Sequence, residues 1–68
     1  MPGFRWRPTG VHKAKLAYRH ALFLKLEGSP QNVDVAVGTI EAAHRLLPDD
    51  VAIAKERATI LAWKASLS

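Results

Sequence analysis

Glu41 and His44 form the one pair of side chains in this sequence at a spacing that could bind a metal ion. Residues three apart share a face of a helix, so the carboxylate and the imidazole would point the same way. Protein zinc sites use three or four such ligands, and no cysteine is present to add a thiolate. Only a symmetric dimer could bring two such pairs together. We therefore expect no metal and no cofactor, and we expect His44 to pack at the edge of the core.

Residue patterns typical of enzymes are missing from the sequence. It contains no phosphate-binding loop, no Gly-x-Gly-x-x-Gly and no His-Glu-x-x-His. Ser29 lies in a turn and Ser66 and Ser68 lie at the C-terminus, where no fixed neighbours would assemble a nucleophile with its base. We predict that the protein is not an enzyme.

Basic and aromatic side chains gather near the N-terminus. The 68 residues carry ten Lys and Arg against six Asp and Glu, a net charge of +4 that favours anionic partners. The first 19 residues hold Phe4, Arg5, Trp6, Arg7, His12, Lys13, Lys15 and Arg19. Such cations could contact phosphates, and the aromatic rings could stack on bases. Nucleic-acid binding through this region therefore stays open as an alternative function, although the segment 49–65 lacks the exposed polar residues of a recognition helix.

Glycine and proline divide the chain into an arm and three helical segments. Pro2, Gly3 and Pro8 exclude a helix from residues 1–9, which we expect to form an extended arm. Helical periodicity predicts helices over 10–27, 33–47 and 49–65, and no stretch has a strand pattern. The predicted fold is all-α, with an antiparallel helical hairpin plus one helix forming a single domain over 10–68.

More apolar stripes run along these helices than three helices can bury against one another. We expect Ala36, Ile40, Ala43 and Leu47 of the second helix, and Ala54, Ala58, Leu61 and Ala65 of the third, to face inward. Two further stripes are then left for a partner, because soluble monomers rarely expose large apolar patches. The first consists of Ile53, Ile60, Trp63 and Leu67, and the second of Leu16 and Phe23. Alternatively, Phe4 or Trp6 of the arm folds back over the second stripe.

The segment from Ala36 to Leu61 resembles a tetratricopeptide repeat. Ala36, Ile40, Ala43 and Pro48 match the second helix of that repeat, and Ala58 and Leu61 match the first helix of the next. Ala54 and Arg57 depart from the pattern, which often has a large aromatic residue and leucine there. The resemblance covers about one and a half repeats over 14–65, whereas stacks of such repeats usually need at least three for stability.

Membership of that family would imply a peptide-binding groove. Its groove-facing positions would fall on Lys15, Tyr18, Leu22, Lys25, Lys55, Thr59 and Ala62. A groove lined by lysines would suit an acidic peptide or a C-terminal carboxylate. The alternative is that these lysines simply form a solvated helix face.

A non-enzymatic, protein-binding role fits these observations best. We expect an adaptor, inhibitor or assembly subunit that self-associates or docks on a larger protein through the arm and the surplus apolar stripes. The predicted contact residues are Phe4, Arg5, Trp6, Arg7, Leu16, Phe23, Ile53, Ile60, Trp63 and Leu67. No apolar run approaches the roughly 20 residues of a membrane span, and no signal-peptide pattern opens the chain. The lack of cysteines favours the cytoplasm, so we expect a cytoplasmic protein.

Overall fold

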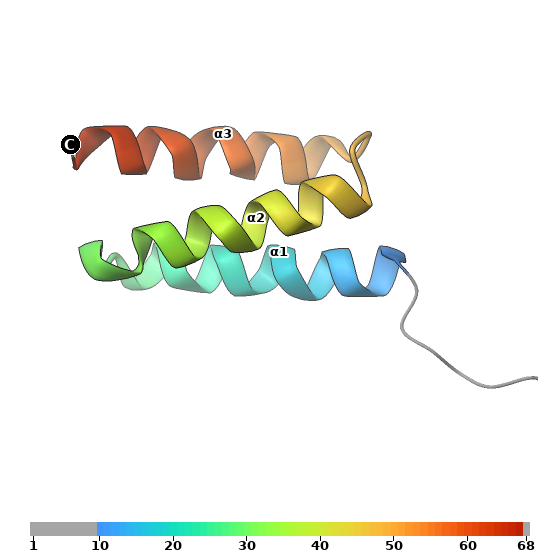
Figure 1. Cartoon of the computed structure of the whole chain (residues 1–68), viewed down its shortest axis with the longest axis horizontal. Helices are drawn as coiled ribbons and strands as arrows, with labels where there is room; N and C mark the ends of the chain where they lie inside the picture. The colour runs from blue at the N-terminus through green and yellow to red at the C-terminus, as the bar shows by residue number, and fades with distance from the viewer. Residues whose placement is uncertain (1–9, 68) are drawn as a thin grey trace, which may run out of the picture.

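Three helices with α2 in the middle make up the fold (Figure 1). The computed structural model describes residues 10–67 and has no strand among them. Its elements are α1 (Gly10–Glu27), a short 3-10 turn η1 (Pro30–Asn32), α2 (Val33–Leu46) and α3 (Val51–Ser66). Consecutive helices run antiparallel, and α2 packs against both of the others (Figure 1). The predicted all-α, three-helix antiparallel fold is confirmed, while the predicted arm, residues 1–9, lies outside the described residues.

Local chemistry explains where each helix stops and starts. Gly28 adopts a φ of +71°, a left-handed conformation that ends α1, and its N–H donates to the Leu24 carbonyl at 3.2 Å. Pro48 disfavours the α conformation at Leu47, where φ is −133°, so α2 ends at Leu46. Asp50 caps α3, because its Oδ1 accepts a hydrogen bond from the Ile53 N–H at 3.0 Å. The prediction for α1 is confirmed in full, and those for α2 and α3 are off by one or two residues at these caps.

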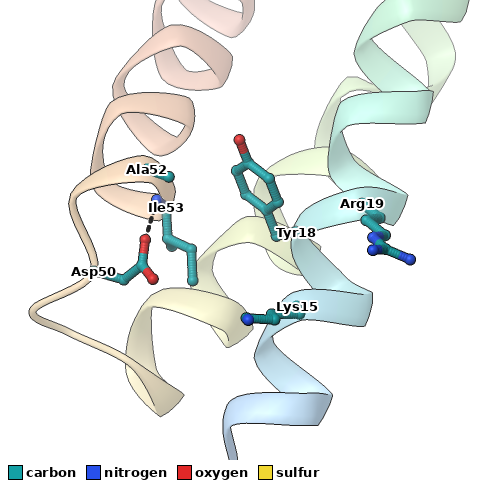
Figure 2. A pocket seen from close by; sticks show the side chains of 6 residues that line it. All are labelled: Lys15, Tyr18, Arg19, Asp50, Ala52 and Ile53. Carbon is teal, nitrogen blue, oxygen red and sulfur yellow. Dashed lines mark hydrogen bonds between the residues drawn. The ribbon is translucent and has the colours of Figure 1, made fainter.

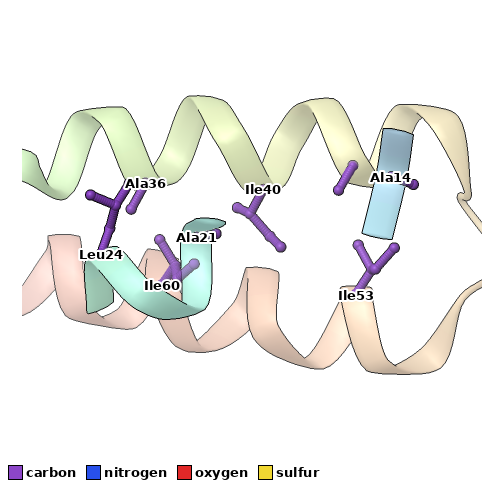
Figure 3. Packing of buried hydrophobic residues seen from close by; sticks show 8 residues of the cluster. Ala14, Ala21, Leu24, Ala36, Ile40, Ile53 and Ile60 are labelled. Atoms are coloured by element: carbon purple, nitrogen blue, oxygen red, sulfur yellow. The ribbon is translucent and has the colours of Figure 1, made fainter. Parts of the chain in front are cut away.

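Small side chains let α1 and α2 approach closely. Ala14 and Ala21 of α1 and Ala36 and Ala43 of α2 are all fully buried. Ile40 is also fully buried and fills space between the helices, as ridge-into-groove packing requires. In Figure 3 those of these side chains that are labelled converge with Ile53 and Ile60 of α3. The predicted inward positions Ala36, Ile40 and Ala43 are therefore confirmed.

Helix α3 packs with the face opposite to the one predicted. Ile53 and Ile60 are 2% and 0% exposed and belong to the core, whereas Ala54, Ala58 and Ala65 are exposed. The prediction for this helix was wrong. Burying an isoleucine is worth roughly 1.5–3 kcal/mol, more than burying an alanine, so the bulkier stripe turns inward.

Candidate functional site: the outer surface of α1

The partner surface predicted on α3 does not form as a patch. Ile53 and Ile60, two of its four members, lie in the core. Trp63 is half-buried and packs against the same core, which leaves only Leu67, 46% exposed, facing solvent. The side chains bulky enough to attract a partner are also the ones that hold α3 on α2.

The other predicted stripe, on α1, does lie on the surface. Leu16 and Phe23 are 53% and 60% exposed, and Leu26, which the prediction missed, is 82% exposed. At 100° per residue these three side chains fall on the side of α1 opposite the buried Ala14 and Ala21. The sequence signal for Leu26 is its position three residues after Phe23. We call Leu16, Phe23 and Leu26 the outer α1 surface.

Basic side chains surround the outer α1 surface. Helix α1 carries Lys13, Lys15, Arg19 and Lys25 against a single acidic residue, Glu27. Its helical geometry places Lys13 on one flank of the line from Leu16 to Phe23, with Lys15 and Arg19 on the other flank. A shallow hollow of about 110 Å³ opens in this surface, lined by His12, Lys15, Leu16 and Arg19.

A second, larger hollow lies between α1 and the start of α3. It has a volume of about 220 Å³, and its lining residues are Lys15, Tyr18, Arg19, Asp50, Ala52 and Ile53. In Figure 2 the Tyr18 ring stands between the two helices, and Asp50 accepts the hydrogen bond that caps α3. Lys15 and Arg19 therefore separate two neighbouring hollows, one on the outer surface and one facing α3.

The groove positions implied by the tetratricopeptide resemblance are only partly brought together. Lys15 and Tyr18 line the larger hollow. Lys25 instead approaches the buried Glu56 of α3, with 3.7 Å between its Nζ and Oε2 of the carboxylate. Thr59 donates a hydrogen bond to the Lys55 carbonyl at 3.0 Å, so this hydroxyl already has a partner within its own helix.

Glu41, half of the candidate metal-binding pair, bonds to a different helix. The guanidinium Nε of Arg57 on α3 donates to its Oε1 at 2.6 Å. This hydrogen bond lowers the pKa of the Glu41 carboxyl below its ordinary value, and His44 adds a smaller charge effect in the same direction. No group of three His, Cys, Asp or Glu side chains between residues 10 and 67 is placed to hold a metal ion.

The predicted contact residues of the arm, Phe4, Arg5, Trp6 and Arg7, lie outside the described residues. Their predicted contact with a partner stays a prediction, as does the alternative in which Phe4 or Trp6 covers Leu16 and Phe23. Within the described helices, none is long and apolar enough to cross a membrane. The chain matches no family model, no curated protein and no solved structure, so the tetratricopeptide resemblance also stays a prediction.

Proposed function

We propose that this chain is a small, non-enzymatic protein-binding module that docks through the outer α1 surface. The observation that carries this proposal is the exposure of Leu16, Phe23 and Leu26, at 53%, 60% and 82%. Each such side chain contributes roughly 1.5–3 kcal/mol when it is fully buried, so a partner that covers all of them gains substantial binding energy. An adaptor, an inhibitor or an assembly subunit in the cytoplasm would use such a surface.

The composition of the core supports the same proposal. Five of its nine buried apolar residues are alanines or valine, namely Ala14, Ala21, Val33, Ala36 and Ala43. These small side chains remove little apolar area from water, and a chain of this size rarely gains more than about 3–5 kcal/mol from its core. Burying the outer α1 surface in a complex would therefore add to the stability of the fold itself.

Aspartate substitutions on the outer α1 surface test the proposal. Leu16→Asp and Phe23→Asp place a charge on side chains that are more than half exposed, so both variants are expected to keep the wild-type circular dichroism spectrum. The matched control is Val35→Asp on α2, where the side chain is 50% exposed. The full chain and each variant are used as bait in a host lysate, and captured proteins are quantified by mass spectrometry.

The expected result is a specific protein that the wild-type chain and Val35→Asp recover and that both α1 variants lose. A direct measurement with the purified partner would follow, in which Phe23→Asp weakens binding at least about tenfold, as for a central apolar contact. Equal recovery by wild type, Leu16→Asp and Phe23→Asp would contradict docking through this surface.

Nucleic-acid binding is a second candidate, favoured by the exposed cations Lys13, Lys15 and Arg19 on α1. Phosphate contacts would make binding to DNA or RNA fall steeply as salt rises. Charge reversal at Arg5 and Arg7 would weaken such binding, whereas Phe23→Asp would change it far less. No measurable binding at low salt would remove this candidate.

A further inference from the structure

We infer that the outer α1 surface binds an acidic, amphipathic helix of a different protein, and not a second copy of this chain. This inference rests on the proposed function and names the chemistry of the partner. Three features of α1 carry it: the spacing of its apolar side chains, the sign of its flanking charges, and the basic hollow beside Leu16.

The spacing of the apolar side chains matches a helical partner. Phe23 follows Leu16 by seven residues, about two turns or 10.5 Å along the axis, and Leu26 follows one turn later. A partner helix presents its own apolar side chains at the same seven-residue period, so the two sets can interdigitate along α1. The side chains on one face of an extended strand repeat about every 6.6 Å, which does not match the rise from Leu16 to Phe23.

The flanking charges disfavour self-pairing and favour an acidic partner. Lys13 lies on one side of the line from Leu16 to Phe23, and Lys15 and Arg19 lie on the other side, in the same angular range as Leu26. If two copies of α1 paired through this surface, in either direction, their cations would face each other, and only Glu27 could offset them. Like charges across an interface oppose association, whereas aspartate and glutamate at the flanking positions of a partner would pair with these cations.

The hollow beside Leu16 indicates where one of these acidic side chains would bind. Three of its four lining residues, His12, Lys15 and Arg19, are basic, and Leu16 supplies an apolar wall. Its volume of about 110 Å³ is suited to one side chain rather than to a segment of chain. A glutamate fits this chemistry, because its methylene groups can lie on Leu16 while the carboxylate meets Lys15 and Arg19.

Two synthetic helical peptides test the inference against the full-length chain. Both have about three heptads with leucine at the core positions, and they differ only in carrying glutamate or glutamine at the flanking positions. Binding is measured by fluorescence anisotropy of the labelled peptide. We expect the glutamate peptide to bind at least about tenfold more tightly than the glutamine peptide, with an advantage that shrinks as salt rises.

Variants of the chain locate the contact. Phe23→Asp is expected to abolish binding, and Val35→Asp on α2 is expected to leave it unchanged. The double variant Lys15→Glu/Arg19→Glu is expected to prefer a third peptide that carries lysine in place of glutamate. Such a reversal of preference would report charge pairing and not a general effect on folding.

Several results would overturn the inference. Equal binding of the glutamate and glutamine peptides would contradict the inference that the partner is acidic, while leaving the proposal of docking through α1 intact. If the wild-type chain dimerises and Phe23→Asp does not, a second copy occupies the surface. If the peptides bind to Trp6→Ala but not to the wild-type chain, the arm occupies it. Binding only to DNA or to vesicles of anionic lipid would assign the surface to those ligands. If no peptide binds and lysate recovery is also insensitive to Phe23→Asp, the proposed function fails as well.

Discussion

Arg57 of α3 binds both carboxylate oxygens of Glu41 on α2, with Nε 2.6 Å from Oε1 and Nη2 3.4 Å from Oε2. A guanidinium that meets a carboxylate through two donors fixes orientation as well as distance. The pair forms in the rotation of α3 that burial of Ile53 and Ile60 produces, and it joins α2 to α3 at the edge of the core. Arg57 also occupies the Glu41 carboxylate, which the sequence spacing grouped with His44 as a candidate pair of metal ligands.

The Arg57–Glu41 pair makes stability depend on pH in a defined window. The hydrogen bond from Arg57 holds the pKa of Glu41 below its ordinary value of 4.5. A group with a lowered pKa in the folded state contributes stability above its unfolded pKa and loses it as pH falls through its folded pKa. In thermal melts at neutral pH, the wild type should thus have a higher Tm than Glu41→Gln. This difference in Tm should shrink below about pH 4.5. A margin that stays unchanged at about pH 3 would contradict this assignment.

Gly38 and Gly28 are expected to respond in opposite directions to the same substitution. Gly38 lies inside α2, is exposed, and has no atom within 4 Å of the position where a Cβ would stand. Gly38→Ala should therefore stabilise the protein by about 1 kcal/mol and raise Tm by about 4–8 °C. Gly28→Ala should destabilise it by about 1–2 kcal/mol, because φ at Gly28 is +71°. A lower Tm for Gly38→Ala would indicate a contact that the described residues do not show.

The helices, and one of the two apolar surfaces, could be predicted from the sequence because local chemistry determines them. Gly28, Pro30 and Pro48 interrupt the helical pattern through their own backbone chemistry. They predicted the helix ends to within two residues. The heptad spacing of Leu16 and Phe23 on a basic helix likewise indicated an exposed stripe. These signals depend on neighbours in sequence and not on tertiary packing.

The inward face of α3 could not be read from periodicity. Both of its faces are apolar, so a helical wheel offers two solutions, and we expected the face that carries the alanines to pack inward. Burial of Ile53 and Ile60 against α2 decides between them, and the contact between Arg57 and Glu41, 16 residues apart in sequence, accompanies this arrangement. The approach of Lys25 to Glu56 across α1 and α3 is a tertiary contact of the same kind.

Truncations on the two faces of α3 should differ greatly in cost. Ile60 is fully buried, so Ile60→Ala is expected to lower the free energy of unfolding by about 2–5 kcal/mol. Val51 is 70% exposed on the same helix, and Val51→Ala should change it by no more than about 0.5 kcal/mol. Leu61→Ala, at a half-buried site, should cost less than Ile60→Ala. Urea denaturation followed by circular dichroism gives all three values, and a larger loss for Leu61→Ala would mean that the other face is the core.

Glu56 is expected to weaken the fold that surrounds it. This residue of α3 is 9% exposed, and its Oε2 accepts no hydrogen bond from the described residues. Lys25 of α1 offsets the charge from 3.7 Å but is itself partly solvated. Replacing a buried charged group by an apolar one of similar size is often neutral or stabilising, whereas removing only its partner leaves a buried charge uncompensated.

A double-mutant cycle between Glu56 and Lys25 measures this balance. Glu56→Met should leave the free energy of unfolding equal to or above that of wild type, because the methionine fills the same space without an unsatisfied oxygen. Lys25→Met should lower it by about 1–3 kcal/mol, since the Glu56 carboxylate then loses the cation that lies 3.7 Å from its Oε2. Adding Lys25→Met to Glu56→Met should cost much less than Lys25→Met in the wild type, and the difference is the coupling between the two side chains. A greater loss for Glu56→Met than for Lys25→Met would show that the carboxylate stabilises the fold through contacts other than Lys25.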